Sequence, residues 1–267
     1  MIVGNGDLRQ VLRSSAIEGR VIHALLLREI LTRFGRHNIG FLWLFVEPML
    51  FTLGITALWS LTRSVHGSNL PIAAFALTGY SAVLLWRNMP MRCIGAIEPN
   101  LSLMYHRNVR IADIFAARLV LEAGGATISF VVLSITFIAV GLIDPPENVL
   151  QVVGGWLMMA WFGVSLALLL GSLAQESELV EKLWHPAAYL LFPLSGSGFL
   201  VDALPTAAQH YVLYLPMVHA VEYIREGYFG SRFQAHYDLG YMAVVNIALL
   251  FVAAAKLRKV SREVVPE

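Results

Sequence analysis

The sequence predicts an all-α membrane protein with several spans, and its composition and charge distribution carry that prediction. Of 267 residues, 57% are hydrophobic and 14% are charged, whereas soluble domains contain roughly 25% charged residues. A spanning helix needs about 20 mostly apolar residues, and several charge-free windows of the sequence have that length. We therefore expect one polytopic transmembrane domain over residues 1–267. The charge-free windows are 48–62, 64–86, 123–143, 148–175, 183–201, 203–221 and 239–255.

Six membrane spans follow from the charge-free lengths and the helix breakers. Window 203–221 is interrupted by Pro205, Pro216 and several polar residues. It therefore predicts two short half-helices over 202–230 that dip into the membrane from outside without crossing it. The expected spans are 41–61, 71–89, 117–142, 149–173, 183–200 and 239–255.

The basic residues predict the orientation of these spans. Cytoplasmic loops carry an excess of Lys and Arg. With an internal N-terminus, sixteen of the 19 basic residues lie inside, and only Arg63, Arg225 and Arg232 lie outside. A seventh span through 203–221 would weaken this bias to twelve against seven. We therefore expect both termini in the cytoplasm.

Bulk properties exclude several functional classes. The net charge is +1 and no basic arm with interleaved aromatics is present, which argues against nucleic-acid binding. The single cysteine, Cys93, allows neither an intrachain disulfide nor a thiol-rich metal site. No Gly-x-x-x-x-Gly-Lys-Ser/Thr motif occurs, so ATP hydrolysis would need a separate subunit. We expect no catalytic residue, metal or cofactor in this chain.

Residues 1–40 form the expected cytoplasmic tail, which ends in an amphipathic helix over 23–37. Its apolar face includes Ala24, Leu27 and Leu31, and its polar face includes Arg28 and Glu29. This pattern predicts a helix in the membrane interface with its basic face toward anionic headgroups. A topological anchor and a role in admitting lipid-linked cargo are equally compatible with it.

The longest internal connection, 92–110, lies between the second and third spans. Pro99-Asn100 punctuates it, and a short polar and aromatic helix follows. Such a helix could dock into a groove on a soluble partner. The residues alone favour a solvated loop.

Charged residues inside the spans are the main candidates for function. Glu47-Pro48 predicts a kink with a pore-facing acid, or an acid paired with an Arg of a neighbouring span. Arg118 and Glu122 are spaced i, i+4 and are expected to pair with each other.

Two further groups of residues give weaker indications of function. Ser195 or Ser197 with a histidine would suit an intramembrane hydrolase, although Pro193 and the adjacent glycines more simply break the helix. His219, Glu222 and Glu226 share a helix face, which is expected to be solvated or to contain a Glu222–Arg225 pair rather than a metal site.

Several stretches resemble the membrane subunits of ABC-2 type polysaccharide exporters, especially those of capsule export in Gram-negative bacteria. Each motif alone is weak, but their order and spacing cover essentially the whole chain. The matching stretches are Arg33-Phe34-Gly35-Arg36-His37-Asn38-Ile39-Gly40-Phe41-Leu42-Trp43, Glu47-Pro48, Tyr105-His106-Arg107-Asn108-Val109, Ala117-Arg118 with Glu122, and 215–229.

The resemblance implies a homodimer bound to two copies of a cytoplasmic ABC ATPase, which holds the ATP and Mg. It also implies a periplasmic inner-membrane adaptor, an outer-membrane export channel and a lipid-linked polysaccharide cargo, in the inner membrane of a Gram-negative bacterium. Export of O-antigen or teichoic acid is the alternative within transport. The connection between spans 2 and 3 would contain the coupling helix, comprising Asn100, Leu101, Ser102, Leu103, Met104, Tyr105, His106 and Arg107.

The resemblance also implies a channel for the polymer and a gate on the external side. Aromatic and polar side chains near the inner span ends would allow a long polymer to slide through many weak contacts. The channel candidates are Trp43, Glu47, Tyr80, Trp86, Arg87, Trp184, His185 and Tyr189, and the gate candidates are Pro205, Pro216, His219, Glu222 and Arg225.

Overall fold

The computed structural model describes residues 5–34, 38–62, 70–107, 109–232 and 234–264. Residues 1–4 of the predicted tail and 35–37 of the predicted interfacial helix lie outside these ranges. The described residues form helices and contain no strand. The α-helices are α1 Asn5–Phe34, α2 Asn38–Thr62, α3 Ile72–Cys93, α4 Leu101–Arg107, α5 Ile111–Ala139, α6 Val149–Glu176, α7 Glu178–Leu194, α8 Thr206–Val212, α9 Pro216–Phe229 and α10 Leu239–Val264.

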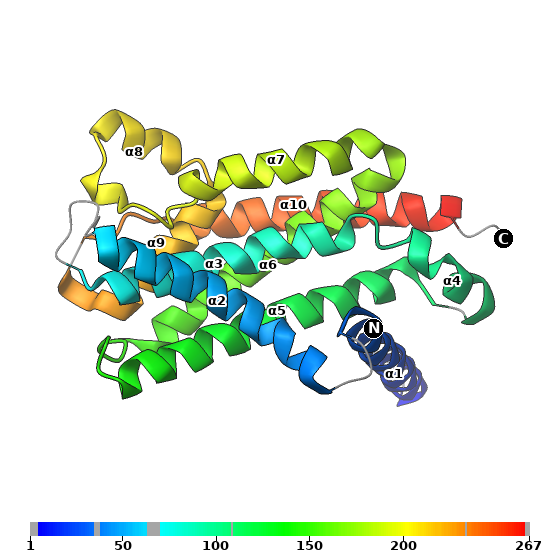
Figure 1. Cartoon of the computed structure of the whole chain (residues 1–267). Helices are drawn as coiled ribbons and strands as arrows, with labels where there is room; N and C mark the ends of the chain where they lie inside the picture. The colour runs from blue at the N-terminus through cyan, green and yellow to red at the C-terminus, as the bar shows by residue number, and fades with distance from the viewer. Residues whose placement is uncertain (1–4, 35–37, 63–69, 108, 233, 265–267) are drawn as a thin grey trace.

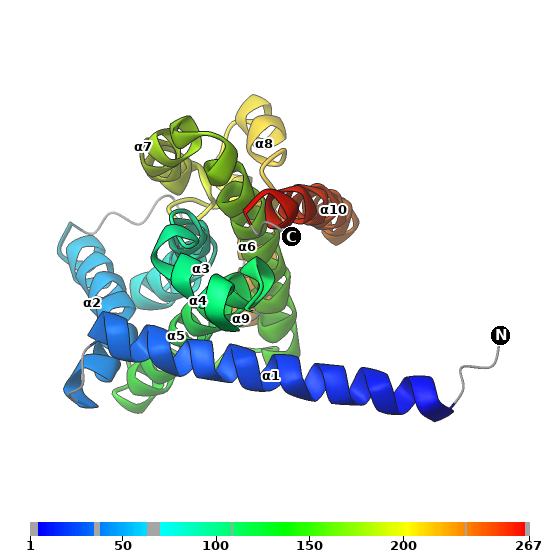
Figure 2. The ribbon, with the colours of Figure 1, turned by 90° about the vertical axis from the view of Figure 1, so that its right-hand side faces the viewer.

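The long helices run side by side and the short ones lie at the two ends of the bundle (Figure 1). At one end lie α4 and the C-terminus, and at the other end lies α8. Helix α1 crosses the bundle near the α4 end, and its N-terminal part extends beyond the other helices (Figure 2). The two ends of the bundle are thus built differently.

Helix α3 lies at the centre of the bundle. It packs against α2, α5, α6 and α9, and 17 of its 22 residues are buried. Because other helices cover it, α3 does not need the continuous apolar surface of a lipid-facing helix. This explains why Arg87, Asn88 and Arg92 are tolerated within it.

Among the described residues, four helices are long and apolar enough to cross a membrane. They are Leu42–Leu61, Ile111–Ala139, Val149–Glu176 and Leu239–Glu263. Helix α3 is too polar for this criterion, and α7, with 17 residues, is too short. Composition therefore marks four spans in the described chain, where the sequence predicts six.

Helix boundaries differ from the predicted spans at specific signals. Helix α5 begins at Ile111, six residues before the predicted span, where the Asp113 side chain accepts a hydrogen bond from the backbone N–H of Arg110 at 2.9 Å. It ends at Ala139, just before Gly141, whose φ of +72° favours glycine. Helix α7 ends at Leu194 rather than at residue 200, because Pro193 and Gly196, with φ +81°, turn the chain.

Glycines on α6 allow it to approach its neighbours closely. A Cβ on Gly171 would lie 2.8 Å from the Cβ of Cys93 and 2.9 Å from the Cζ of Phe115. A Cβ on Gly155 would lie 2.6 Å from the Cγ1 of Ile224. Small residues at membrane helix contacts permit such packing, so α6 joins α3, α5 and α9 into one core.

We predict that Gly171→Ala lowers the thermal stability of the purified protein. The added methyl must displace α3 or α5, at a cost of roughly 1–3 kcal/mol. The matched control is Gly124→Ala, because nothing lies within 4 Å of a Cβ at that position. Melting in detergent should separate the two variants, and equal melting temperatures would contradict the packing.

Candidate functional site

Helix α4 forms an exposed projection at one end of the bundle (Figure 1). The 3₁₀ turn Glu98–Asn100 leads into it, with Pro99 in a position where no backbone donor is needed. Met104 faces the core with 6% of its surface exposed, whereas Tyr105 is 65% exposed. The side chains of the predicted coupling residues His106 and Arg107 lie outside the described part. The α4 surface is therefore anchored on one face and available on the other.

Helix α1 is attached to the segment that carries α4. The Arg28 guanidinium donates to Oδ1 of Asn100, and the Asn100 amide donates to the carbonyl of Ala96 at 2.8 Å. Nearer the N-terminus of α1, the Glu18 carboxylate lies 3.4 Å from the Arg110 guanidinium. The two contacts hold the start of α4 and the start of α5 against α1.

The polar face of α1 contacts the protein, which corrects the prediction that it faces headgroups. Arg28 and Glu29 both bind groups of the bundle. Leu27 and Leu31 of the apolar face are exposed instead, by 47% and 56%. The reason is that Asn100 and Arg118 supply partners that the helical pattern alone does not show.

Arg118 and Glu122 do not pair as their spacing predicts. The Nε of Arg118 lies 3.2 Å from Glu29, and its Nη1 donates to the carbonyl of Arg92 at 2.7 Å. Glu122 lies 2.9 Å from the Nε of Arg92. Each charge prefers a partner on another helix, so a chain of polar contacts links α1, α5 and α3.

This chain of contacts ends beside the predicted kink of α2. A small cavity of about 20 Å³ separates Glu47 and Pro48 from Asn88, Arg92 and Glu122. The cavity places Glu47 in the same polar surroundings as Arg92. The predicted alternative of an acid near an Arg of a neighbouring span therefore has a geometric basis.

A shallow groove runs along the exposed face of α2. It has a volume of about 450 Å³, and its lining includes Trp43, Glu47, Phe51 and Gly54. Trp43 is 53% exposed. Apart from Glu47, the lining is apolar or glycine, so a single carboxylate interrupts an apolar surface.

The predicted channel residues divide into a buried and an exposed set. Trp86 is fully buried between Phe162 and Trp184, with ring centroids 6.1 and 6.4 Å away. Trp184 and Tyr80 are each 6% exposed. Rings packed in this way contact the core of the chain rather than a polymer, so these three residues have packing roles in this structure.

Trp43, His185 and Tyr189 are exposed, and Arg87 is half-buried. The Arg87 guanidinium lies 5.4 Å from the centre of the Tyr189 ring. This cation–π contact joins α3 to α7.

At the opposite end of the bundle, Arg225 of α9 is fully buried. Its Nη1 donates to the carbonyls of Gly196 and Phe199 at 2.6 and 2.7 Å, and its Nη2 donates to the carbonyl of Ser197 at 2.6 Å. The guanidinium also stacks 3.8 Å from the centre of the Phe75 ring. One side chain thus fastens α9 to the turn after α7 and to α3.

Glu222 and His219 are also buried, which corrects the expectation of a solvated helix face. Glu222 accepts from the backbone N–H groups of Val201 and His236 at 3.4 and 3.1 Å. His219 contacts the carbonyl of Leu213 and the N–H of Asp238, both at 2.8 Å. These side chains hold the connections on both sides of α9.

The serines considered for catalysis have local structural partners. Ser195 donates to the carbonyl of Phe192 at 2.6 Å, and Ser197 lies 3.4 Å from the same oxygen. Both residues are buried, with at most 1% of their surface exposed. Within the described chain, no group of three or more His, Cys, Asp or Glu residues is placed to hold a metal ion.

A third polar cluster at this end was not singled out by the sequence. Glu226 accepts from Tyr237 at 2.6 Å and from the Gln151 amide. The hydrogen bond to Glu226 raises the pKa of Tyr237 to about 12, so the phenol stays protonated and acts as the donor. Only the fold brings Gln151 of α6 to this cluster, because Gln151 lies 75 positions from Glu226 in the sequence.

The comparisons with known proteins decide the family. The ABC-2 type transporter family model matches residues 20–229. The chain belongs to the ABC-2 type transporter family. This confirms the family resemblance predicted from the motifs, and the match covers α2 to α9 together with most of the α1 residues that contact the bundle.

Its relatives are named for capsule export. The chain is 42% identical over 262 residues to the capsule polysaccharide export inner-membrane protein BexB of Haemophilus influenzae, covering 98% of this chain and 99% of BexB. It is 45% identical over 254 residues to CtrC of Neisseria meningitidis serogroup B, which carries the same description, covering 95% and 96%. It is 28% identical over 240 residues to the polysialic acid transport protein KpsM of Escherichia coli, covering 89% and 92%.

We predict that Arg225→Gln strongly destabilises this ABC-2 protein. Losing the guanidinium leaves buried carbonyls without donors, and charged hydrogen bonds contribute about 1.5–3 kcal/mol each. Arg232→Gln is the matched control, because Arg232 is exposed and its 3.4 Å pair with Asp144 is worth little. Thermal unfolding should show a large loss for the first variant only. Similar losses in both would argue against the role of Arg225.

Proposed function

We propose that this chain is the permease subunit of an ATP-driven exporter that moves lipid-linked capsular polysaccharide across the inner membrane. The observation that carries the proposal is the near full-length similarity, at 42–45% identity, to BexB and CtrC. Membership of the ABC-2 family supports a transport role for the membrane subunit. The buried and locally bonded Ser195 and Ser197 favour transport over intramembrane hydrolysis.

Capsular polysaccharide is preferred to O-antigen or teichoic acid as the cargo. BexB and CtrC are described as capsule export proteins, and the more distant KpsM is described as a polysialic acid transport protein. We infer that the host is a Gram-negative bacterium in which a periplasmic adaptor and an outer-membrane channel continue the export route.

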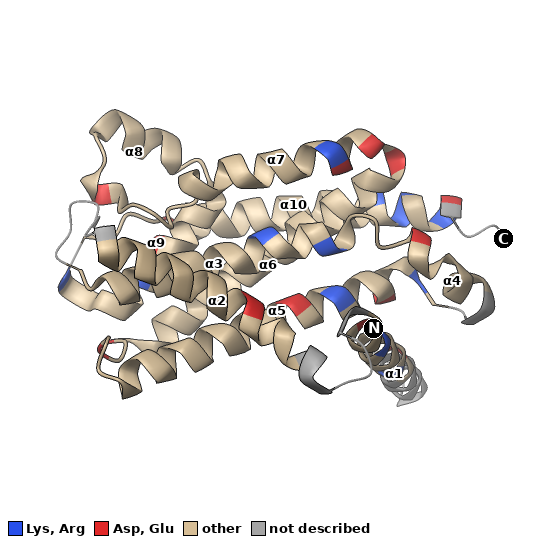
Figure 3. Cartoon of the chain, in the orientation of Figure 1, with Lys and Arg blue, Asp and Glu red and all other residues tan. Residues whose placement is uncertain are grey.

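We infer that α2, α3, α5, α6, α7 and α10 cross the membrane, with α8 and α9 as external re-entrant helices. Central burial of α3 supports its crossing despite its polar residues. Lys and Arg gather toward the α4 end of the bundle (Figure 3), which by the positive-inside rule favours cytoplasmic termini. Helix α1 then lies at the cytoplasmic interface.

The active unit in this proposal is a homodimer of the chain bound to two copies of a cytoplasmic ABC ATPase. The ATPase holds ATP and Mg, and helix α4 docks on it. The exposure of Tyr105 and the anchoring of Met104 support this role for α4. The contacts of Arg28 and Arg118 would carry a movement of α4 to α1, to α3 and to the Glu47 region.

We predict that Tyr105→Ala, alone or with Arg107→Glu, weakens co-purification with the cognate ATPase by about tenfold. Exposed aromatic anchors commonly dominate interface energies. Tyr211→Ala is the matched control, because Tyr211 of α8 is 75% exposed at the other end of the bundle. If the Tyr105 variant keeps its ATPase partner and ATPase activity at wild-type levels, α4 is not the coupling helix.

The exposed face of α2 is the preferred polymer-contacting surface. A carboxylate such as Glu47 is costly against lipid, so a groove containing it should face water or another copy of the chain. Trp43 and Phe51 supply the rings on which sugars stack, beside that carboxylate. His185 and Tyr189 provide the corresponding exposed groups on α7, and Arg87 of α3 is half-buried against the Tyr189 ring.

We predict that combining Trp43→Ala with Glu47→Gln lowers surface polysaccharide by about tenfold while leaving the ATPase complex intact. The change removes polymer contacts and few packing contacts. Phe251→Ala on α10 is the control, because this ring is 77% exposed on a different helix. If the amount of surface polysaccharide, measured with a capsule-specific stain, is unchanged, α2 does not line the channel.

A further inference from the structure

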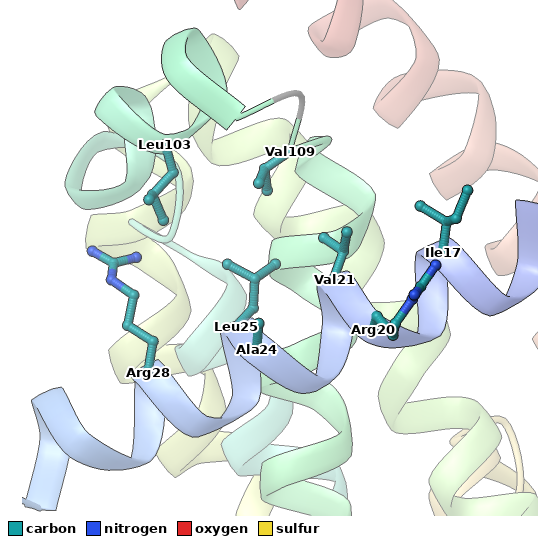
Figure 4. A pocket seen from close by; sticks show the side chains of 8 residues that line it. All are labelled: Ile17, Arg20, Val21, Ala24, Leu25, Arg28, Leu103 and Val109. Carbon is teal, nitrogen blue, oxygen red and sulfur yellow. The ribbon is translucent and has the colours of Figure 1, made fainter.

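A groove separates α1 from α4 and the segment that follows α4 (Figure 4). Its volume is about 490 Å³, within the range of small-molecule sites. Arg28 and Leu103 lie at one end of the groove, and Ile17 and Arg20 lie toward the other. The remaining lining residues are aliphatic, namely Val21, Ala24, Leu25 and Val109.

The described lining of this groove carries uncompensated positive charge. Its charged groups are the two guanidiniums, and none of its described residues is a carboxylate. Arg28 binds the neutral amide of Asn100. Arg20 is exposed and forms no ion pair with any residue that the structure describes. The nearby acids are occupied elsewhere, because Glu18 pairs with Arg110 and Glu29 pairs with Arg118.

The apolar floor of the groove continues along α1. Ala24, Leu27 and Leu31 are spaced at i, i+3 and i+7 and therefore share one face of the helix. Leu27 and Leu31 are exposed by 47% and 56%. In a helix at the membrane interface, exposed leucines of this kind are covered by acyl chains. The groove, which has one arginine toward each end, thus lies next to a lipid-facing stripe of α1.

We propose that the groove binds an anionic phospholipid of the cytoplasmic leaflet. The Arg20 guanidinium contacts the lipid phosphate, and an acyl chain follows Val21 and Ala24 toward Leu27 and Leu31. Arginine matches phosphate geometry, and basic pockets on the cytoplasmic side of membrane proteins bind anionic headgroups. The placement of α1 at this leaflet rests on the proposed orientation of the permease.

Bound lipid would act as a wedge between α1 and the α4 segment. One wall of the groove moves relative to the other if α4 moves, because Leu103 of α4 and Val109 form one wall and α1 forms the other. Anionic lipid would thereby set the resting position of α4 relative to α1.

The test measures lipid binding by the purified full-length chain, without ATPase or polymer. Phosphatidylglycerol and phosphatidylcholine are titrated separately, and binding is followed by native mass spectrometry and by the melting temperature. We expect phosphatidylglycerol to bind and stabilise the wild type, whereas phosphatidylcholine does neither. Because export is not measured, failure of this test leaves the proposed transport function standing, and failure of transport leaves the lipid site standing.

Two variants address the two halves of the site. Arg20→Gln should weaken phosphatidylglycerol binding about fivefold, in line with the contribution of one basic residue near anionic lipid. Ala24→Trp should block the groove and lose binding while keeping the helical content. Arg258→Gln is the matched control, since Arg258 is an exposed arginine on α10 outside the groove, and it should bind like the wild type.

Three outcomes would overturn the proposal. One is wild-type binding by Arg20→Gln, and another is equal loss in Arg258→Gln, which would indicate attraction to overall positive charge. The third is equal stabilisation by inorganic phosphate or glycerol phosphate, which would make the groove a site for free phosphate rather than lipid.

Discussion

Satisfaction of buried polar groups inside the bundle is the constraint on which this structure depends. Lipid offers no hydrogen-bond partners, so each polar group at membrane depth must find one within the protein. Arg225 meets this demand at its two terminal nitrogens, which donate to three backbone carbonyls while the guanidinium stacks on an aromatic ring. Its buried Nε has no hydrogen-bond partner among the described residues. Gly79 makes the arrangement possible, because a Cβ there would lie 2.6 Å from both the Arg225 Nη2 and the Ser197 carbonyl.

The two ends of the molecule meet this constraint in different ways. At the α8 end, the fully buried charged side chains bind backbone groups, as Glu222 does with Val201 and His236. At the α4 end, charged side chains mainly bind one another, as Arg118 does with Glu29 and Arg92 does with Glu122. Backbone contacts fix one geometry, whereas side-chain ion pairs can exchange partners at low cost. This difference suits a fixed α8 end and a movable α4 end.

How far the sequence predicts the structure depends on the range of the interaction involved. Helix existence was largely predictable from hydrophobic length, and the early start of α5 coincides with a local hydrogen bond from the Arg110 backbone N–H to the Asp113 carboxylate. The pairing of Arg118 was predicted wrongly, because its spacing to Glu122 reports only on neighbours along one helix. Its partner Glu29 lies 89 positions earlier in the sequence. The burial of Trp86 could not be predicted from the sequence either, since a ring near a span end can face either lipid or the core.

The sequence by itself determined that the chain is an α-helical membrane protein, and its ordered motifs indicated the ABC-2 family. Both conclusions rest on composition and on the order of residues along the chain, which need no knowledge of contacts. Only the tertiary structure decided which side chains are exposed, which charges pair and where the grooves lie. Helix packing sets these properties, because it joins residues such as Arg28 and Asn100 that are separated by 72 positions. The neighbours of each helix likewise decide why Tyr105 is exposed while Met104 is buried, and why Trp43 is exposed while Trp86 is buried.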